Sequence, residues 1–103
     1  MTIEDIRQLA LSVDATASRY ESTSRGDSYT VWREIRPLGL MADDRHEEAW
    51  AFQIDRYTVN EFDEVARALF EALDADPRVA FEYHPTDDPG TRYIHHIYDC
   101  EGY

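Results

Sequence analysis

The spacing of apolar residues changes twice along the chain, and this change most constrains the fold. In residues 29–36 and 48–58 apolar and polar residues alternate, as in a half-buried β-strand. In residues 61–75 apolar residues recur every three or four positions, as in an amphipathic helix. Alternation returns in residues 79–83 and 93–98. The order strand, strand, helix, strand, strand predicts an α+β protein.

Capping residues predict where two helices begin. Thr2 is the predicted N-cap of a helix over residues 2–13, with Asp5 at the capping-box position. Asn60 is the predicted N-cap of the helix over 61–75, with Asp63 at the equivalent position.

The complete prediction is one domain over residues 1–103, folded as a two-layer sandwich. Four main strands form a mostly antiparallel sheet, residues 16–20 are a candidate for a short fifth strand, and both helices cover one face. Residues 99–103, after the last predicted strand, are expected to form a tail.

The charge and the single cysteine exclude several classes of function. A formal charge of −12 argues against binding to a DNA backbone, because phosphate contacts need a basic face. Cys100 is the only cysteine, so an intramolecular disulfide is excluded. The first residues do not resemble a signal peptide, and no apolar run reaches the ~18 residues that a membrane span requires. We therefore expect no membrane partner and formation in a reducing cytoplasm.

The residues with catalytic or metal-binding chemistry do not form a recognisable site. His95 and His96 are adjacent on a strand, so they are expected to face opposite sides of the sheet. His46 lies in a loop whose spacing matches no metal motif. Cys100 is expected to be a passive thiol, with no third group to orient a nucleophile. We therefore predict no enzyme activity, no catalytic residues, no cofactor and no metal.

Two sets of residues are instead predicted to bind proteins. Since two helices cover one face of a sheet, aromatic residues at the alternate strand positions are expected at a subunit–subunit interface. These residues are Trp32, Tyr57 and Tyr98. The long loop after residue 37 places apolar residues beside charged ones, and we interpret it as a docking element for another protein. Its predicted contact residues are Leu38, Leu40, Met41, Asp43, Asp44 and Arg45. The alternative is that its apolar residues fold back onto the domain's own sheet.

The order of these segments resembles the tail terminator (tail completion) proteins of long-tailed bacteriophages. The resemblance is carried by YTVWRE at 29–34, WAFQIDRY at 50–57, the helix that follows, VAFEY at 79–83 and DDPG at 87–90. It covers about three quarters of the chain. The chain departs from the family in its strong acidity and in ending soon after the last predicted strand.

The resemblance implies a structural protein of the virion. Such a protein forms a ring, typically a hexamer, that caps the tail tube and joins it to the head-completion (stopper) protein. DNA meets the ring only in transit through the lumen. The location implied is the tail or neck of the virion, after assembly in the cytoplasm of the host bacterium.

Two alternatives belong to other classes of protein. A small dimeric ferredoxin-like enzyme of the monooxygenase type would need histidine or asparagine side chains that face one cavity. An acidic inhibitor that mimics DNA would need carboxylates concentrated in rows on one face, whereas here they are spread along the whole chain.

Overall fold

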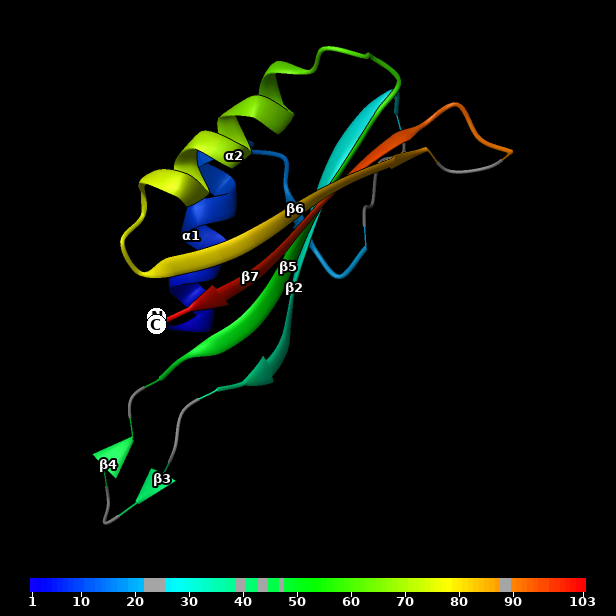
Figure 1. Ribbon diagram of the computed structural model, residues 1–103. Helices are drawn as coiled ribbons and strands as arrows, with labels where there is room; N and C mark the ends of the chain where they lie inside the picture. Colours follow the sequence, from blue (N-terminus) through cyan, green and yellow to red (C-terminus); the bar gives the residue numbers. More distant parts are fainter. Residues whose placement is uncertain (22–25, 39–40, 43–44, 47, 88–89) are drawn as a thin grey trace.

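The predicted strands pair into a five-stranded sheet with both helices on one side (Figure 1). The computed structural model describes residues 1–21, 26–38, 41–42, 45–46, 48–87 and 90–103. The elements, in chain order, are α1 (Ile3–Val13), β1 (Ser18–Arg19), β2 (Ser28–Pro37), β3 (Met41–Ala42), β4 (Arg45–His46), β5 (Trp50–Thr58), α2 (Glu64–Ala75), β6 (Val79–Asp87) and β7 (Ile94–Gly102). The predicted α+β class is confirmed.

The sheet has the strand order β1-β2-β5-β7-β6 and is mixed. β1 runs parallel to β2, and the other neighbours are antiparallel. The short fifth strand is therefore real, and it makes the sheet mixed at one edge. Its Arg19 side chain bonds Glu34 of β2, with an Nε–Oε2 distance of 3.0 Å. Hydrogen bonds from Arg19 and from Tyr20 lower the pKa of Glu34 to about 2.

The two helix starts differ in how well the sequence predicts them. Thr2 Oγ1 accepts from the Asp5 N–H at 3.0 Å, and Asp5 Oδ2 accepts from the Thr2 N–H at 2.8 Å, as predicted. α2, in contrast, begins at Glu64, and its N-cap is Asp63. The prediction of Asn60 as the N-cap is wrong because the Asn60 N–H donates to Thr58 Oγ1, which holds residue 60 in a turn.

The last strand extends beyond its prediction. β7 continues to Gly102, so the predicted tail at 99–103 is wrong. The reason is that β7 is a central strand: Gly102 lies between Trp50 of β5 and Val79 of β6. A Cβ atom at residue 102 would lie 2.3 Å from Met1 Sδ, so only glycine fits beneath the N-terminus.

The hydrophobic core lies between the helices and one face of the sheet. Trp32, Ile54 and Tyr98 pair across β2, β5 and β7, and their exposed fractions are 2%, 0% and 0%. Ile6, Ala10, Leu69 and Leu73 cover this row from the helices. Trp32 and Tyr98 therefore belong to the subunit's own core, and their assignment to a subunit–subunit interface is wrong. The alternation was predicted correctly, but in β2 Trp32 rather than Tyr29 or Val31 faces the helices.

A buried arginine joins both helices to the sheet. Arg56 of β5 is 5% exposed and donates to both carboxylate oxygens of Asp63, at 2.9 and 3.2 Å. It also reaches Asp14, the C-cap of α1, at 3.4 Å and Thr30 at 3.2 Å. Burial opposes ionisation of Asp63, but the hydrogen bonds from Arg56 and the Ala66 N–H outweigh it and lower the pKa of Asp63.

A small hairpin projects from the body of the protein, and we call it the arm. It consists of β3 and β4, which pair beyond Pro37 of β2 and Trp50 of β5 and lie beyond both helices (Figure 1). The arm contributes to principal extents of 51 × 26 × 25 Å. The long loop of the sequence prediction thus contains a small hairpin, with Met41 opposite His46 and Ala42 opposite Arg45.

Candidate protein-interaction surfaces

No described helix covers the sheet face opposite α1 and α2, and the chain after β1 borders it at Tyr20 and Glu21 (Figure 1). We call it the open face. Its side chains come from every second residue of the four long strands, because neighbouring residues point to opposite sides. Tyr29, Val31 and Arg33 contribute from β2, and Gln53, Asp55 and Tyr57 from β5. The expectation that the helices cover only one face is confirmed.

Aromatic rings gather at the end of the open face that is far from the arm. We define the tyrosine cluster as Tyr29, Tyr57, Tyr93 and His95. The rings of Tyr29 and Tyr57 stack at 4.7 Å between centroids, and Tyr57 stacks on His95 at 4.1 Å. Tyr93 packs edge-on against both tyrosines. Of the three residues predicted at the subunit interface, Tyr57 alone therefore lies on this face.

Polar contacts hold the cluster in place. His95 Nε2 lies 2.8 Å from Asp55 Oδ1, and Gln53 Nε2 donates to the same carboxylate oxygen at 2.8 Å. Tyr93 Oη donates to the Gly26 carbonyl oxygen at 2.6 Å. A histidine paired with a carboxylate can exchange a proton. Among the described residues lining the adjacent hollow of about 360 Å³, however, there is no serine, cysteine or lysine.

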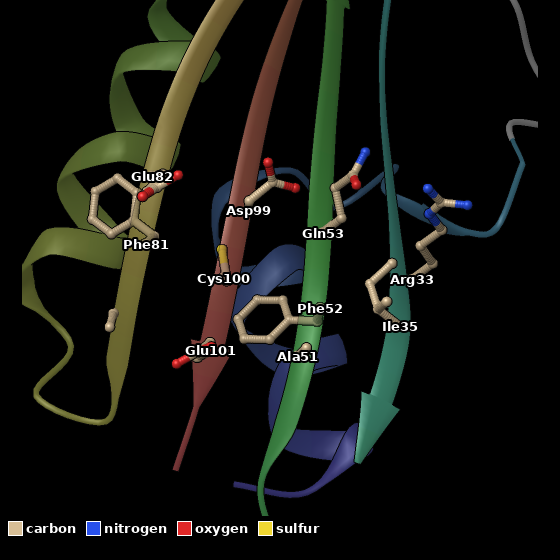
Figure 2. A pocket seen from close by; sticks show the side chains of 11 residues that line it. Arg33, Ile35, Ala51, Phe52, Gln53, Phe81, Glu82, Asp99, Cys100 and Glu101 are labelled. Atoms are coloured by element: carbon tan, nitrogen blue, oxygen red, sulfur yellow. The ribbon is translucent and has the colours of Figure 1, made fainter. Parts of the chain in front are cut away.

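Charged side chains occupy the half of the open face that is nearer the arm. Arg33, Gln53, Asp99 and Glu82 pair in one row across β2, β5, β7 and β6, as Figure 2 shows. This row and Glu101 border a shallow hollow of about 760 Å³. The row is electrostatically polarised, because its arginine stands on β2 and its acids stand on β7 and β6. Such a surface favours one orientation of a charged partner over another.

The residues considered for chemistry are separated by the fold. His95 and His96 lie on opposite faces, as predicted: His95 bonds Asp55 on the open face, and His96 Nδ1 lies 2.7 Å from Tyr83 Oη on the helix side. Cys100 is 4% exposed, and burial raises the pKa of its thiol. Within the described residues no three His, Cys, Asp or Glu side chains are grouped to hold a metal ion.

Only part of the predicted docking loop can be described. Leu38 is half-buried, and its N–H donates to the Ala49 carbonyl oxygen at 2.8 Å, which continues the β2–β5 pairing by one step. The backbones of Met41 and Arg45 lie in β3 and β4. Leu40, Asp43 and Asp44 lie outside the described residues. The docking role of the loop stays a prediction.

A second surface, beside α2 and β6, was missed by the sequence prediction. Phe62 and Phe70 belong to the apolar pattern that predicts an amphipathic helix over residues 61–75, but they are 89% and 41% exposed. Phe62 precedes the N-cap Asp63, so the helical spacing does not reach it. We call the hollow of about 600 Å³ between α2 and β6 the α2–β6 groove. The sequence predicts a helix that begins at residue 61 and therefore includes Phe62. Because α2 begins at Glu64, Phe62 lies outside the helix and is exposed.

Comparisons with protein-family models and with curated protein sequences find no match to this chain. Among the described residues no helix is long and apolar enough to cross a membrane.

Proposed function

We propose that this protein is the subunit of a ring that caps the tail tube of a long-tailed bacteriophage and joins it to the head-completion protein. The observation that carries the proposal is the open face, together with the projecting arm. An α+β subunit with one uncovered sheet face and one protruding hairpin has two different surfaces for neighbours. A closed ring needs two such surfaces, because its contacts are head-to-tail.

The tyrosine cluster supports the ring contact. Tyrosine is enriched at protein interfaces because it combines a large apolar ring with a polar hydroxyl group. Here three tyrosines and His95 are already stacked and hydrogen-bonded in the isolated subunit. Less side-chain freedom is therefore lost when a neighbour covers them. We assign Tyr57, at the centre of the cluster, to the subunit–subunit contact.

The acidity of the chain supports a lumen through which DNA passes. With a net charge of −12, a ring wall built from this subunit repels the phosphate backbone and does not retain it. The proposal places the ring in the neck of the virion, with DNA as a transient occupant. The partners are the tail tube on one side and the head-completion protein on the other.

The enzyme alternative has no comparable support. It needs histidines that face one cavity, whereas His95 and His96 lie on opposite faces of the sheet.

The arm provides the test of tube capping. Leu40→Ser with Met41→Ser is expected to leave the melting temperature of the subunit almost unchanged, to block capping, and to give phage tails of irregular length. Gln8→Ala with Ser12→Ala, at exposed positions of α1, is the control and is expected to give normal tails. Tail lengths are measured by electron microscopy. Unfolding of the double variant, or normal tails, would refute the docking role.

A further inference from the structure

The α2–β6 groove contains a buried polar atom that lacks a partner. His96 is 7% exposed and lines the groove beneath Tyr83 and α2. Its Nδ1 lies 2.7 Å from Tyr83 Oη. Its Nε2 is fully buried and has no hydrogen bond within the described residues. Most buried polar side-chain atoms are paired, so an unpaired one that lines a groove is a position where a bound group can complete the pairing.

The surroundings of His96 keep its ring neutral. Burial lowers the pKa of His96, Arg56 and His95 act in the same direction, and Asp63 opposes them. Burial also raises the pKa of Tyr83, so its hydroxyl stays protonated and can donate to Nδ1 or accept from it. With either tautomer Nε2 lacks a partner among the described residues: it is a donor when Tyr83 donates to Nδ1, and an acceptor when Nδ1 donates to Tyr83.

The groove lies along an unpaired sheet edge. β6 pairs with β7 only, at the end of the strand order. Every second residue of β6 directs its backbone N–H and C=O groups away from β7, and no described strand uses these groups; Pro85 has no N–H to donate. Exposed edges of this kind accept an extended segment of another protein as an additional strand. One face of such a strand would lie over the groove, and the other would lie beside the open-face residue Glu82.

The chemistry around the edge defines the segment. Toward the groove, Phe62, Phe70 and Tyr83 are exposed apolar rings. The rim carries acids that outnumber its arginine, and that arginine, Arg67, is already paired with Glu71 at 3.1 Å. The rim acids are Glu61, Glu64, Glu71 and Asp74. On the open side, Glu82 is 82% exposed. An added strand would therefore have acidic residues on both of its faces and aromatic rings on the groove face alone. This arrangement favours a segment in which basic and apolar residues alternate. They disfavour a second copy of a chain of charge −12.

We propose that β6 and the α2–β6 groove bind an extended, basic segment of a partner protein. The segment pairs with β6 as a sixth strand, places apolar side chains against Phe62 and Phe70, and supplies a hydrogen-bond partner to His96 Nε2. This proposal is independent of ring formation, because it uses neither the open-face tyrosine cluster nor the arm.

The test uses three synthetic peptides as probes on the full-length protein. The first, acetyl-RVRFRQR-amide, alternates basic residues with apolar or amide ones. The second, acetyl-RRRVFQR-amide, has the same composition without the alternation. The third, acetyl-EVEFEQE-amide, reverses the charge. Affinity is measured by calorimetry, amide protection by hydrogen exchange, and the His96 ring by ¹⁵N NMR.

The alternating basic peptide is expected to bind at least about tenfold more tightly than either control. It should protect the amides of residues 79–87 and shift the Nε2 resonance of His96. Phe62→Ala should weaken binding about tenfold, because it removes an exposed anchor. Ile35→Ala, an equally conservative truncation on the open face, should not weaken it.

Any one of four results would overturn the proposal. Equal binding of the two basic peptides would show charge attraction without strand addition. Protection outside β6, or an unchanged His96 resonance, would place the peptide elsewhere. Protection of β6 by raising the protein concentration alone would show that a second copy fills the groove.

Discussion

The two faces of the sheet are built from alternate residues of the same strands, yet they differ in what they contact. On the helix side, Trp32, Ile54 and Tyr98 are almost completely buried by α1 and α2. On the open side, Arg33 is exposed, Asp55 is buried beneath its contacts with Gln53 and His95, and Tyr57 is half-buried in the tyrosine cluster. The helix side therefore forms the core that stabilises the fold, whereas no described helix covers the open side.

The largest expected effect comes from removing the biggest ring of the helix side. Trp32→Ala should lower the free energy of unfolding by about 3–5 kcal/mol, because the fully packed indole leaves a cavity. Ile35→Ala, on the same strand but 49% exposed, should change it by less than about 0.5 kcal/mol. Urea denaturation of both variants measures the difference. Similar losses for both would show that the two faces do not differ as described.

A loss of about 3 kcal/mol is expected for Arg56→Leu. The substitution leaves the largely buried Asp63 and Asp14 without their shared cation, which ties both helix ends to β5. The matched control is Arg67→Leu, whose pair with Glu71 is exposed and should contribute at most about 0.5 kcal/mol. Thermal unfolding monitored by circular dichroism distinguishes them. An Arg56→Leu variant as stable as the control would show that the pairing of Arg56 with Asp63 and Asp14 does not stabilise the fold.

A smaller effect is expected from pH, through His96. Because the pKa of His96 is lowered in the folded protein, the unfolded chain takes up a proton first as the pH falls through the usual value of 6.5. The free energy of unfolding should therefore decrease from pH 7.5 toward pH 5.5. His96→Phe should flatten this slope, whereas His84→Gln, at an exposed open-face position, should retain it. If His96→Phe leaves the slope intact, another group causes it.

The smallest effect on stability is expected for the tyrosine cluster. Tyr57→Ala should cost the isolated subunit about 1 kcal/mol, since it removes the ring stacks with Tyr29 and His95 on a half-exposed surface. The same change should nevertheless prevent association into rings. Sedimentation of the variant beside Thr86→Ala, in the same cross-strand row, measures both properties. A ring that still forms would exclude the cluster from the contact.

The sequence predicts the elements of this fold better than it predicts their faces. Alternation located β2 and β5, and the capping box located α1, because these signals are local. Trp32 was assigned to the wrong side because β2 has large residues at both sets of positions, and only its pairing with Ile54 resolves them. The sequence predicts Asp63 at the capping-box position rather than as the N-cap. The position of Asp63 depends on its hydrogen bonds with Arg56 of β5, and this contact is not visible in the local sequence. The prediction that His95 and His96 face opposite sides of the sheet is confirmed, since alternation along a strand is sufficient for it.

The α2–β6 groove is not predicted by the sequence. It forms between a helix and an edge strand, and the edge strand cannot be identified before the strand order is known.

The mass of the assembled protein tests the central claim most directly. Native mass spectrometry of the purified chain, at increasing concentration and together with purified tail tubes, reports whether copies associate and in what number. The account predicts a closed ring, a hexamer, that Tyr57→Ala prevents and that binds the end of the tube. A chain that stays monomeric at high concentration and also on the tube would contradict it.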